Sequence, residues 1–235
     1  MDAREFLKEA EALSKKIIVT IDGPAGAGKS TTAKAVAEKT GLPYLDTGAL
    51  YRAVAWKLDK EGVAPEDGGR IAETLKDFKI EVAGGKVTAD GEDVTRAIRT
   101  ARVDSIVSAY AARPEVRDAL AGFQRAQAAN GLVADGRDMG TVIFPDAELK
   151  IFLTASAEER ARRRCAEREA KGESADYDEI LKQVIERDRY DMTREIAPLR
   201  PAQGCVILDS TDMSAAEVVD AIASLAKEIE AQENR

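Results

Sequence analysis

One glycine-rich segment constrains the fold of this chain more than any other feature. Residues 17–21 form a β-branched run that ends in Asp22 and predicts a short buried strand. The octapeptide GPAGAGKS, residues 23–30, follows directly and matches the pattern G-x-x-x-x-G-K-[ST] at every position. Good helix formers continue from Lys29 to Glu38. A strand, a glycine loop and a helix in this order are typical of a phosphate-binding loop.

The residue types of this loop suit the binding of a nucleoside triphosphate. Backbone N–H groups can surround phosphate oxygens only where no Cβ intervenes, and the start of a helix adds partial positive charge. Lys29 is predicted to reach the β- and γ-phosphates, and the Ser30 hydroxyl to ligate Mg²⁺. The predicted triphosphate-binding residues are Gly23, Pro24, Ala25, Gly26, Ala27, Gly28, Lys29, Ser30 and Thr31.

Composition limits the other possibilities. The chain has 235 residues, which suffices for one full core with inserted lobes. Its net charge of −8 argues against a general binder of nucleic acids or membrane surfaces. With no histidine and two distant cysteines, zinc chemistry and a disulfide framework are not indicated. We therefore expect a cytoplasmic monomer, with residues 1–16 forming a short amphipathic helical extension.

The order of the remaining segments predicts a parallel α/β sheet. Apolar runs at 43–46, 131–135, 149–153 and 205–209 give four more strands, which alternate with helices. The expected helices start at Arg52, span 103–129 with Pro114 at a helix start, and cover 157–170 and 177–195. Ser214 and Glu217 form a capping box before the last helix. Between about 61 and 100, segments 79–83 and 86–89 flank Gly84-Gly85 and predict a hairpin in a small antiparallel insertion.

A phosphate loop alone leaves GTPases, ATPases, transporters and kinases open. No Asn-Lys pair occurs, so the N-K-x-D box that reads guanine is missing. Asp135 ends the third strand in the manner of a Walker B acid and is a second predicted Mg²⁺ ligand. The segment Asp135-Gly136-Arg137-Asp138 then places charges at the sheet edge where α/β proteins bind ligands, unless it is simply a polar loop.

A second charged feature is a helical stripe. Spacings of three and four put six residues on one face: Tyr177, Ile180, Val184, Arg187, Asp191 and Arg194. The first three residues of the stripe are apolar and the last three are charged. This change indicates that the core-facing side of the helix continues into a polar site. The alternative is that the helix leaves the body of the protein and its charges are solvated. Arg160, Arg163 and Arg164 share a face that could close on the triphosphate, although Glu158 and Glu159 also suit a solvated face.

These motifs resemble the bacterial cytidylate kinases, in the same order and across almost the whole chain. The matching segments are GPAGAGKST, LDTGALYR, ADGRDMGTVIFPDAELKIFLTAS, RARRR and ERDRYDMTREIAPL. The resemblance implies a P-loop NTPase fold of three α/β/α layers with a five-stranded parallel sheet. It also implies a core at 17–61 and 104–235, an inserted nucleoside-monophosphate lobe at 62–103, and a short helical lid at about 157–174.

The resemblance further implies Mg-ATP-dependent phosphorylation of CMP or dCMP. Arg52, Arg137 and Arg194 would hold the acceptor phosphate, and Arg187 and Asp191 would meet the ribose. Ser108, Arg117 and Asp138 would read the base, and Thr47 takes the place of the family's usual serine. Lys29, Arg137, Arg163 and Arg194 would be catalytic, with Arg160 and Arg163 covering ATP from the lid.

Base selection has a physical reason. Arg117 can donate to O2 and N3 of cytosine, and Asp138 can accept from N4, whereas uracil reverses the polarity at N3 and position 4. Each unpaired buried polar group costs about 1–3 kcal/mol, so we expect CMP well ahead of UMP. The rival interpretations are a P-loop kinase for UMP, AMP or shikimate, and a nucleotide-dependent switch without turnover.

Overall fold

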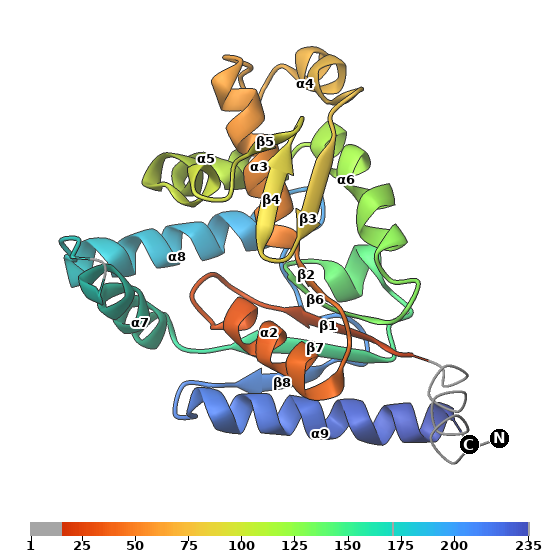
Figure 1. The fold of residues 1–235 in the computed structure, drawn as a ribbon. Coiled ribbons are helices and arrows are strands. Elements are labelled where there is room, and N and C mark those ends of the chain that lie inside the picture. The colour runs from red at the N-terminus through yellow and green to blue at the C-terminus, as the bar shows by residue number, and fades with distance from the viewer. Residues whose placement is uncertain (1–15, 171, 235) are drawn as a thin grey trace.

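The centre of the molecule is a parallel sheet of five strands. In this computed structural model, which describes residues 16–170 and 172–234, the strand order is β2-β6-β1-β7-β8 (Figure 1). The strands are β1 (Ile18–Asp22), β2 (Tyr44–Asp46), β6 (Leu132–Gly136), β7 (Leu149–Thr154) and β8 (Val206–Asp209). All four pairings are parallel, which confirms the predicted sheet. β1 lies in the middle, so the loop that follows it emerges at the centre of the sheet edge.

Helices cover the two faces of this sheet because strand residues alternate between them. Val19, Ile21 and Val133 pack against α2 (Lys29–Thr40) and α9 (Ala215–Glu233). Leu132 and Ala134, from the other face of β6, pack with α3 (Thr47–Lys60), α5 (Ala101–Ala111) and α6 (Pro114–Ala126). The three layers are therefore helix, sheet and helix, as predicted.

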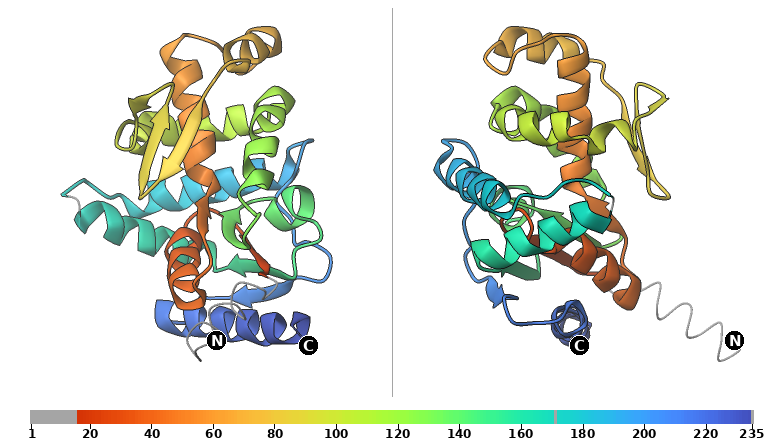
Figure 2. Two further views of the ribbon diagram at one scale, coloured as in Figure 1. Left: turned by 45° about the vertical axis from the view of Figure 1, so that its right-hand side comes forward. Right: turned by 90° about the vertical axis from the view of Figure 1, so that its left-hand side faces the viewer.

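Two further helices extend to one side of the sheet. α7 (Ala157–Ala170) and α8 (Tyr177–Thr193) lie side by side in Figures 1 and 2. Ala161, Ile180 and Val184 form a small apolar cluster between them. This pair carries the arginine-rich segment and the charged half of the α8 stripe.

The insertion forms a separate antiparallel sheet. β3 (Ile80–Ala83), β4 (Lys86–Ala89) and β5 (Glu92–Asp93) pair in that order, and Gly84 and Gly85 make the predicted turn with φ of 56° and 79°. Val87 and Ala89 pack against Ala49 and Ala53 of α3. Figure 2 shows this lobe at the end of the molecule opposite α9.

Several local predictions need correction. Helix α3 begins at Thr47 rather than Arg52, because Asp46 caps it by accepting from the Ala49 N–H at 2.8 Å. The insertion also contains α4 (Gly68–Leu75), which the sequence did not reveal because two glycines open it. A 3₁₀ turn, η1 (Ala97–Arg99), and a π-helical turn, η2 (Met139–Ile143), were likewise not foreseen.

Other local predictions hold. Pro114 starts α6, separate from α5, and Ser214 with Glu217 forms the capping box of α9. α8 ends at Thr193, two residues before the predicted limit. The helical extension predicted for 1–16 lies almost wholly outside the described residues. Within 16–170 and 172–234, no helix is both long and apolar enough to cross a membrane.

Candidate active site

The phosphate loop joins the end of β1 to the start of α2. Gly26 and Gly28 have φ of 81° and 85°, values that a residue with a Cβ rarely adopts. A Cβ on Gly23 would lie 1.9 Å from the Leu153 carbonyl oxygen, so the loop can pass β7 only with glycine there. The loop therefore has the backbone form that its motif predicts.

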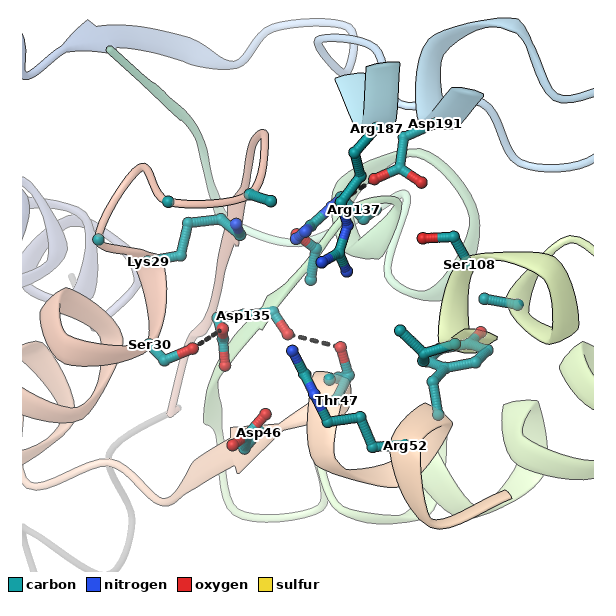
Figure 3. Close-up of a pocket in the computed structure, with 18 of the residues that line it drawn as sticks. Lys29, Ser30, Asp46, Thr47, Arg52, Ser108, Asp135, Arg137, Arg187 and Asp191 are labelled. Atoms are coloured by element: carbon teal, nitrogen blue, oxygen red, sulfur yellow. Dashed lines mark hydrogen bonds and ion pairs between the residues drawn. The ribbon is translucent and has the colours of Figure 1, made fainter. Parts of the chain in front are cut away.

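Lys29 is held inside this loop. Its Nζ donates to the Pro24 carbonyl oxygen at 2.8 Å, and the side chain is buried. Burial, followed by the nearby charges of Arg137 and Arg187, holds the pKa of Lys29 well below its usual range. Figure 3 shows Lys29 directed into the same cavity as Arg137. An anion placed between these cations would stabilise the protonated lysine.

Ser30 and Asp135 meet where a metal ion would bind beside the triphosphate. The Ser30 hydroxyl donates to Asp135 Oδ2 at 2.7 Å, and the Tyr44 hydroxyl donates to Oδ1 at 2.9 Å. Burial, and then the charge of Asp46, raises the pKa of Asp135. No cluster of three or more acidic, Cys or His side chains forms a cage in the described chain. Oxygen ligands supplied by one or two side chains suit Mg²⁺, which takes its other ligands from phosphates and water.

One cavity of about 300 Å³ joins the phosphate loop to α3, α5, β6 and the α7–α8 pair (Figure 3). Most predicted site residues line it: Ala25, Gly26, Gly28, Lys29, Ser30, Thr31, Thr47, Arg52, Ser108, Asp135, Arg137, Asp138, Arg187, Asp191 and Arg194. The structure adds Asp46, Tyr51, Arg99 and Glu167, which the sequence did not single out. It also brings in Arg164, which the sequence placed only on a helical face that could close on the triphosphate. The structure thus brings the triphosphate loop and the predicted acceptor residues to one cavity.

The acceptor-side arginines are already positioned by partners. Arg52 donates to Asp104 Oδ1 at 3.0 Å, and Arg137 donates to Asp191 Oδ2 at 3.1 Å. Arg194 donates to the Ala197 carbonyl oxygen. Fixed guanidinium groups bind a phosphate with little loss of side-chain entropy.

Arg187 differs from these three arginines. Burial, with Arg137 as the next cause, lowers its pKa to about 10. Its Nε is buried without a hydrogen-bond partner among the described residues. A guanidinium with an unused donor in a cavity is suited to a polar ligand.

The two predicted base readers contact each other. Arg117 donates through Nη2 to Asp138 Oδ2 and through Nη1 to the Ala111 carbonyl oxygen at 2.8 Å. Its guanidinium also packs over the Tyr51 ring, 5.5 Å from the centroid. Asp138 lines the cavity whereas Arg117 lies behind it, and both are buried. Asp138 therefore presents its carboxylate at the wall of the cavity, and Arg117 holds that carboxylate from behind.

The lid arginines divide into different environments. Arg160 is buried and donates to the Ala25 carbonyl oxygen at 3.1 Å and to both carboxylate oxygens of Asp188. Arg163 donates to Glu159 and to the Ser210 carbonyl oxygen. Arg164 lines the cavity instead. The ATP contacts expected of Arg160 and Arg163 stay predictions.

The predicted stripe along α8 is buried in an apolar cluster in its first half and lines the cavity in its second half. Ile180 and Val184 are buried against α7, while Arg187 and Asp191 line the cavity together with Arg194, just past the helix end. The alternative of a purely solvated helix end is therefore wrong. Tyr177, the first member of the stripe, is 37% exposed and does not belong to the buried half.

The glycine loop between β1 and α2 has the form of a phosphate-binding loop. With the adjoining Ser30–Asp135 pair and the arginine-lined cavity, it is typical of a P-loop phosphotransferase. The family model for cytidylate kinase matches residues 19–228 of the chain. A cytidylate kinase from an Exiguobacterium species is 45% identical over 93% of this chain and 100% of its own length. One from Geobacter sulfurreducens is 46% identical over 91% of this chain and 94% of its own. The chain belongs to the cytidylate kinase family.

The fold has a further match among solved structures. An uncharacterized protein from Eubacterium ventriosum aligns with a TM-score of 0.51 and 15% identity, over 91% of this chain and 99% of that one. At this identity the similarity concerns the fold alone.

Proposed function

We propose that this protein transfers the γ-phosphoryl group of ATP to CMP or dCMP, which yields ADP and CDP or dCDP. The observation that carries the proposal is the buried ion pair of Arg117 and Asp138, of which Asp138 lines the cavity. Arg117 offers donors to O2 and N3 of cytosine, and Asp138 offers an acceptor to N4. Uracil would set its O4 against the carboxylate and its N3–H against the guanidinium, so UMP should be a poor acceptor.

The rest of the acceptor nucleotide would use the neighbouring side chains. Arg52, Arg137 and Arg194 supply planar cationic groups for the α-phosphate. Arg187 and Asp191 would meet the ribose hydroxyls, and Ser108 would contact the base. Thr47 holds the end of β6 in place, because its hydroxyl donates to the Asp135 carbonyl oxygen at 2.6 Å. Ser108 and Arg52 lie across the cavity from Lys29, as Figure 3 shows, which leaves the reacting phosphates between them.

The donor nucleotide would bind at the phosphate loop, with Lys29 on the β- and γ-phosphates. Ser30 and Asp135 would hold the Mg²⁺ ion, which supplies charge neutralisation to the triphosphate when bound. An α-phosphate oxygen of CMP forms a bond to the γ-phosphorus as the bond to the bridging oxygen of ADP breaks. Because that attacking oxygen is already anionic, the reaction needs no strong general base.

Catalysis then consists of positioning and charge neutralisation by this chain's cations. Lys29, Arg137 and Arg194 face the reacting region, and Arg163 with Arg160 would approach from the lid at about 157–174. We propose that the lobe at 62–103 and this lid close over the core at 17–61 and 104–235. Closure excludes water, which would otherwise hydrolyse ATP.

The proposal is tested by steady-state phosphorylation of CMP, dCMP, UMP and AMP, with wild type and Asp138→Ala. We expect a strong preference for CMP and dCMP that collapses by roughly 10- to 1000-fold in the variant, while ATP binding persists. Asp118→Ala is the matched control, because Asp118 is an exposed acid next to Arg117 on α6.

The alternatives give different results. A best rate with UMP, AMP or shikimate would assign another acceptor to the same P-loop kinase. Tight nucleotide binding without turnover on any acceptor would favour a switch. The ratio of CMP to dCMP rates shows whether Arg187 and Asp191 depend on the 2′-hydroxyl.

A further inference from the structure

Asp22, the last residue of β1, makes contacts that the phosphate loop motif does not explain. Its Oδ1 accepts from the Met139 N–H at 2.9 Å, and its Oδ2 accepts from the Gly140 N–H at 2.8 Å. The side chain is 3% exposed. One carboxylate therefore joins the residue before the phosphate loop to the segment just after Arg137 and Asp138.

The two N–H groups open a helical turn. Met139 and Gly140 are the first residues of η2, and the Asp138 carbonyl oxygen accepts from the N–H groups of Val142 and Ile143. The first N–H groups of any helical segment have no partner within it. An aspartate at the N-cap position of Asp138 would ordinarily accept with its own side chain from the second or third of these N–H groups, which are those of Gly140 and Thr141.

Asp138 does not cap this turn. No side-chain capping bond is present at its position, and its carboxylate instead accepts from Arg117 and lines the cavity. Asp22 satisfies the Met139 N–H and also the Gly140 N–H, which would otherwise attract the Asp138 carboxylate. The base-reading geometry therefore depends on a carboxylate from a different strand.

We propose that Asp22 is a positioning residue for acceptor recognition, because it caps the 139–143 turn and so leaves the Asp138 carboxylate free to face the base. This inference rests on the proposed function. Loss of the Asp22 carboxylate should let Asp138 turn back onto its own helical turn.

The protonation state of Asp22 provides a second way to test its role in capping the 139–143 turn. Burial raises its pKa to about 7, and the negative charge of Asp138 acts in the same direction. The two N–H groups and Lys29 of α2 act in the opposite direction. The paired residues on the neighbouring strands, Gly136 and Phe152, carry no charge. Protonation would remove one acceptor, so capping by Asp22 should weaken as the pH falls through about 7.

The test is the variant Asp22→Asn, whose amide can accept from only one of the two N–H groups. We expect the KM for CMP to rise about 10- to 100-fold and the preference for CMP over UMP to fall, with the KM for ATP nearly unchanged. The effect on CMP should largely vanish in an Asp138→Ala background, because coupled residues are not additive.

Thr20→Val is the matched control. Thr20 is fully buried two residues earlier on the same strand, and its hydroxyl faces Gly140. Within the described residues that hydroxyl has no hydrogen-bond partner. The valine variant therefore alters the same contact region without touching the carboxylate, and we expect its KM for CMP to equal that of wild type.

Wild type alone provides an independent readout that needs no folded variant. The ratio of kcat/KM for CMP to that for UMP should fall between about pH 8 and about pH 6. Ionisation of the phosphate cancels in this ratio because both nucleotides carry the same group. In Asp22→Asn the ratio should be flat.

An unchanged KM for CMP and an unchanged nucleotide preference in Asp22→Asn would overturn the inference. So would a flat ratio in wild type over that pH range. If wild type fails to phosphorylate CMP at all, the proposed function itself fails, which is a different result from an active wild type with an indifferent Asp22 variant.

Discussion

Lys29 is buried beside two other cationic side chains, those of Arg137 and Arg187. Its neighbours Arg137 and Arg187 lower its pKa in addition to the effect of burial. The kcat/KM for ATP reports the free enzyme, in which this lowered pKa applies. Because the protonated amine is the form that binds phosphate, activity must fall as the pH rises through the lowered pKa.

We therefore predict that kcat/KM for ATP declines on the alkaline side well below the usual lysine value of about 10.4. The measurement is a pH profile from about pH 7 to about pH 10 at CMP concentrations well below its KM, so that the free enzyme is the form that binds ATP. Lys34→Met is the control, since Lys34 is exposed on the same helix and should leave the profile unchanged. A profile that stays level to pH 10 would contradict this account of Lys29.

Single residues also show where sequence reasoning ends. The motif identified the phosphate loop, and the resemblance identified Thr47, Arg52, Ser108 and the other predicted acceptor residues that line the cavity. Spacing could not distinguish Arg160 from Arg164, because both lie on one face of α7 and only the position of α8 decides which one is buried against Asp188. Asp22 was assigned only as the end of a strand, since its partners are backbone groups more than a hundred residues away.

Among the elements, α7 and α8 are tied to the phosphate loop by one buried ion pair. Arg160 lies 2.6 Å from Asp188, and their side chains are 5% and 14% exposed. The same guanidinium donates to the Ala25 carbonyl oxygen. The position of α7 and α8 is thus coupled to the shape of the loop.

Asp188→Asn should destabilise the protein and weaken ATP binding together. Removal of one partner leaves a buried charge uncompensated, which costs about 3–5 kcal/mol. Denaturant-induced unfolding gives the free energy, and the KM for ATP gives the functional effect. Glu186→Gln on the same helix is the control, because Lys182–Glu186 is an exposed pair at 4.0 Å. Equal unfolding free energies for the two variants would refute the role of the pair.

The helices and strands that could be predicted are those whose own residues carry a strong local pattern. The five strands, the Gly84-Gly85 hairpin and the Ser214 capping box each follow from adjacent residues. The helix α4 was missed because Gly68 and Gly69 have low helix propensity, although Ile71 and Leu75 bury its apolar face. The turn η2 depends on the distant Asp22, so no local pattern could indicate it.

At the scale of the whole molecule, an acidic protein presents a basic cavity. The net charge is −8, yet five arginines from separate elements line the cavity: Arg52, Arg99, Arg137, Arg164 and Arg187. Arg194 adds a sixth. A charged cleft attracts ligands of opposite sign, and salt screens that attraction over about 10 Å at 0.1 M.

We predict that kcat/KM for CMP falls about 3- to 10-fold between roughly 20 mM and 500 mM KCl. Cytidine, which lacks the phosphate, is the matched ligand. Its inhibition constant against CMP should change less than about twofold over the same range. A parallel change for cytidine and CMP would mean that salt acts on the protein rather than on phosphate attraction.

The antiparallel lobe contributes little to the chemistry of the cavity. Among the described residues that line it, Arg99 alone comes from 62–103, while the other acceptor-side groups belong to α3, α5, α8 and the segments around β6. In related proteins the hairpin can therefore become longer or shorter, or change its sequence, without altering most of the side chains that line the cavity. We therefore expect amino-acid substitutions between related proteins to be more frequent in the insertion at 62–103 than among the residues that line the cavity.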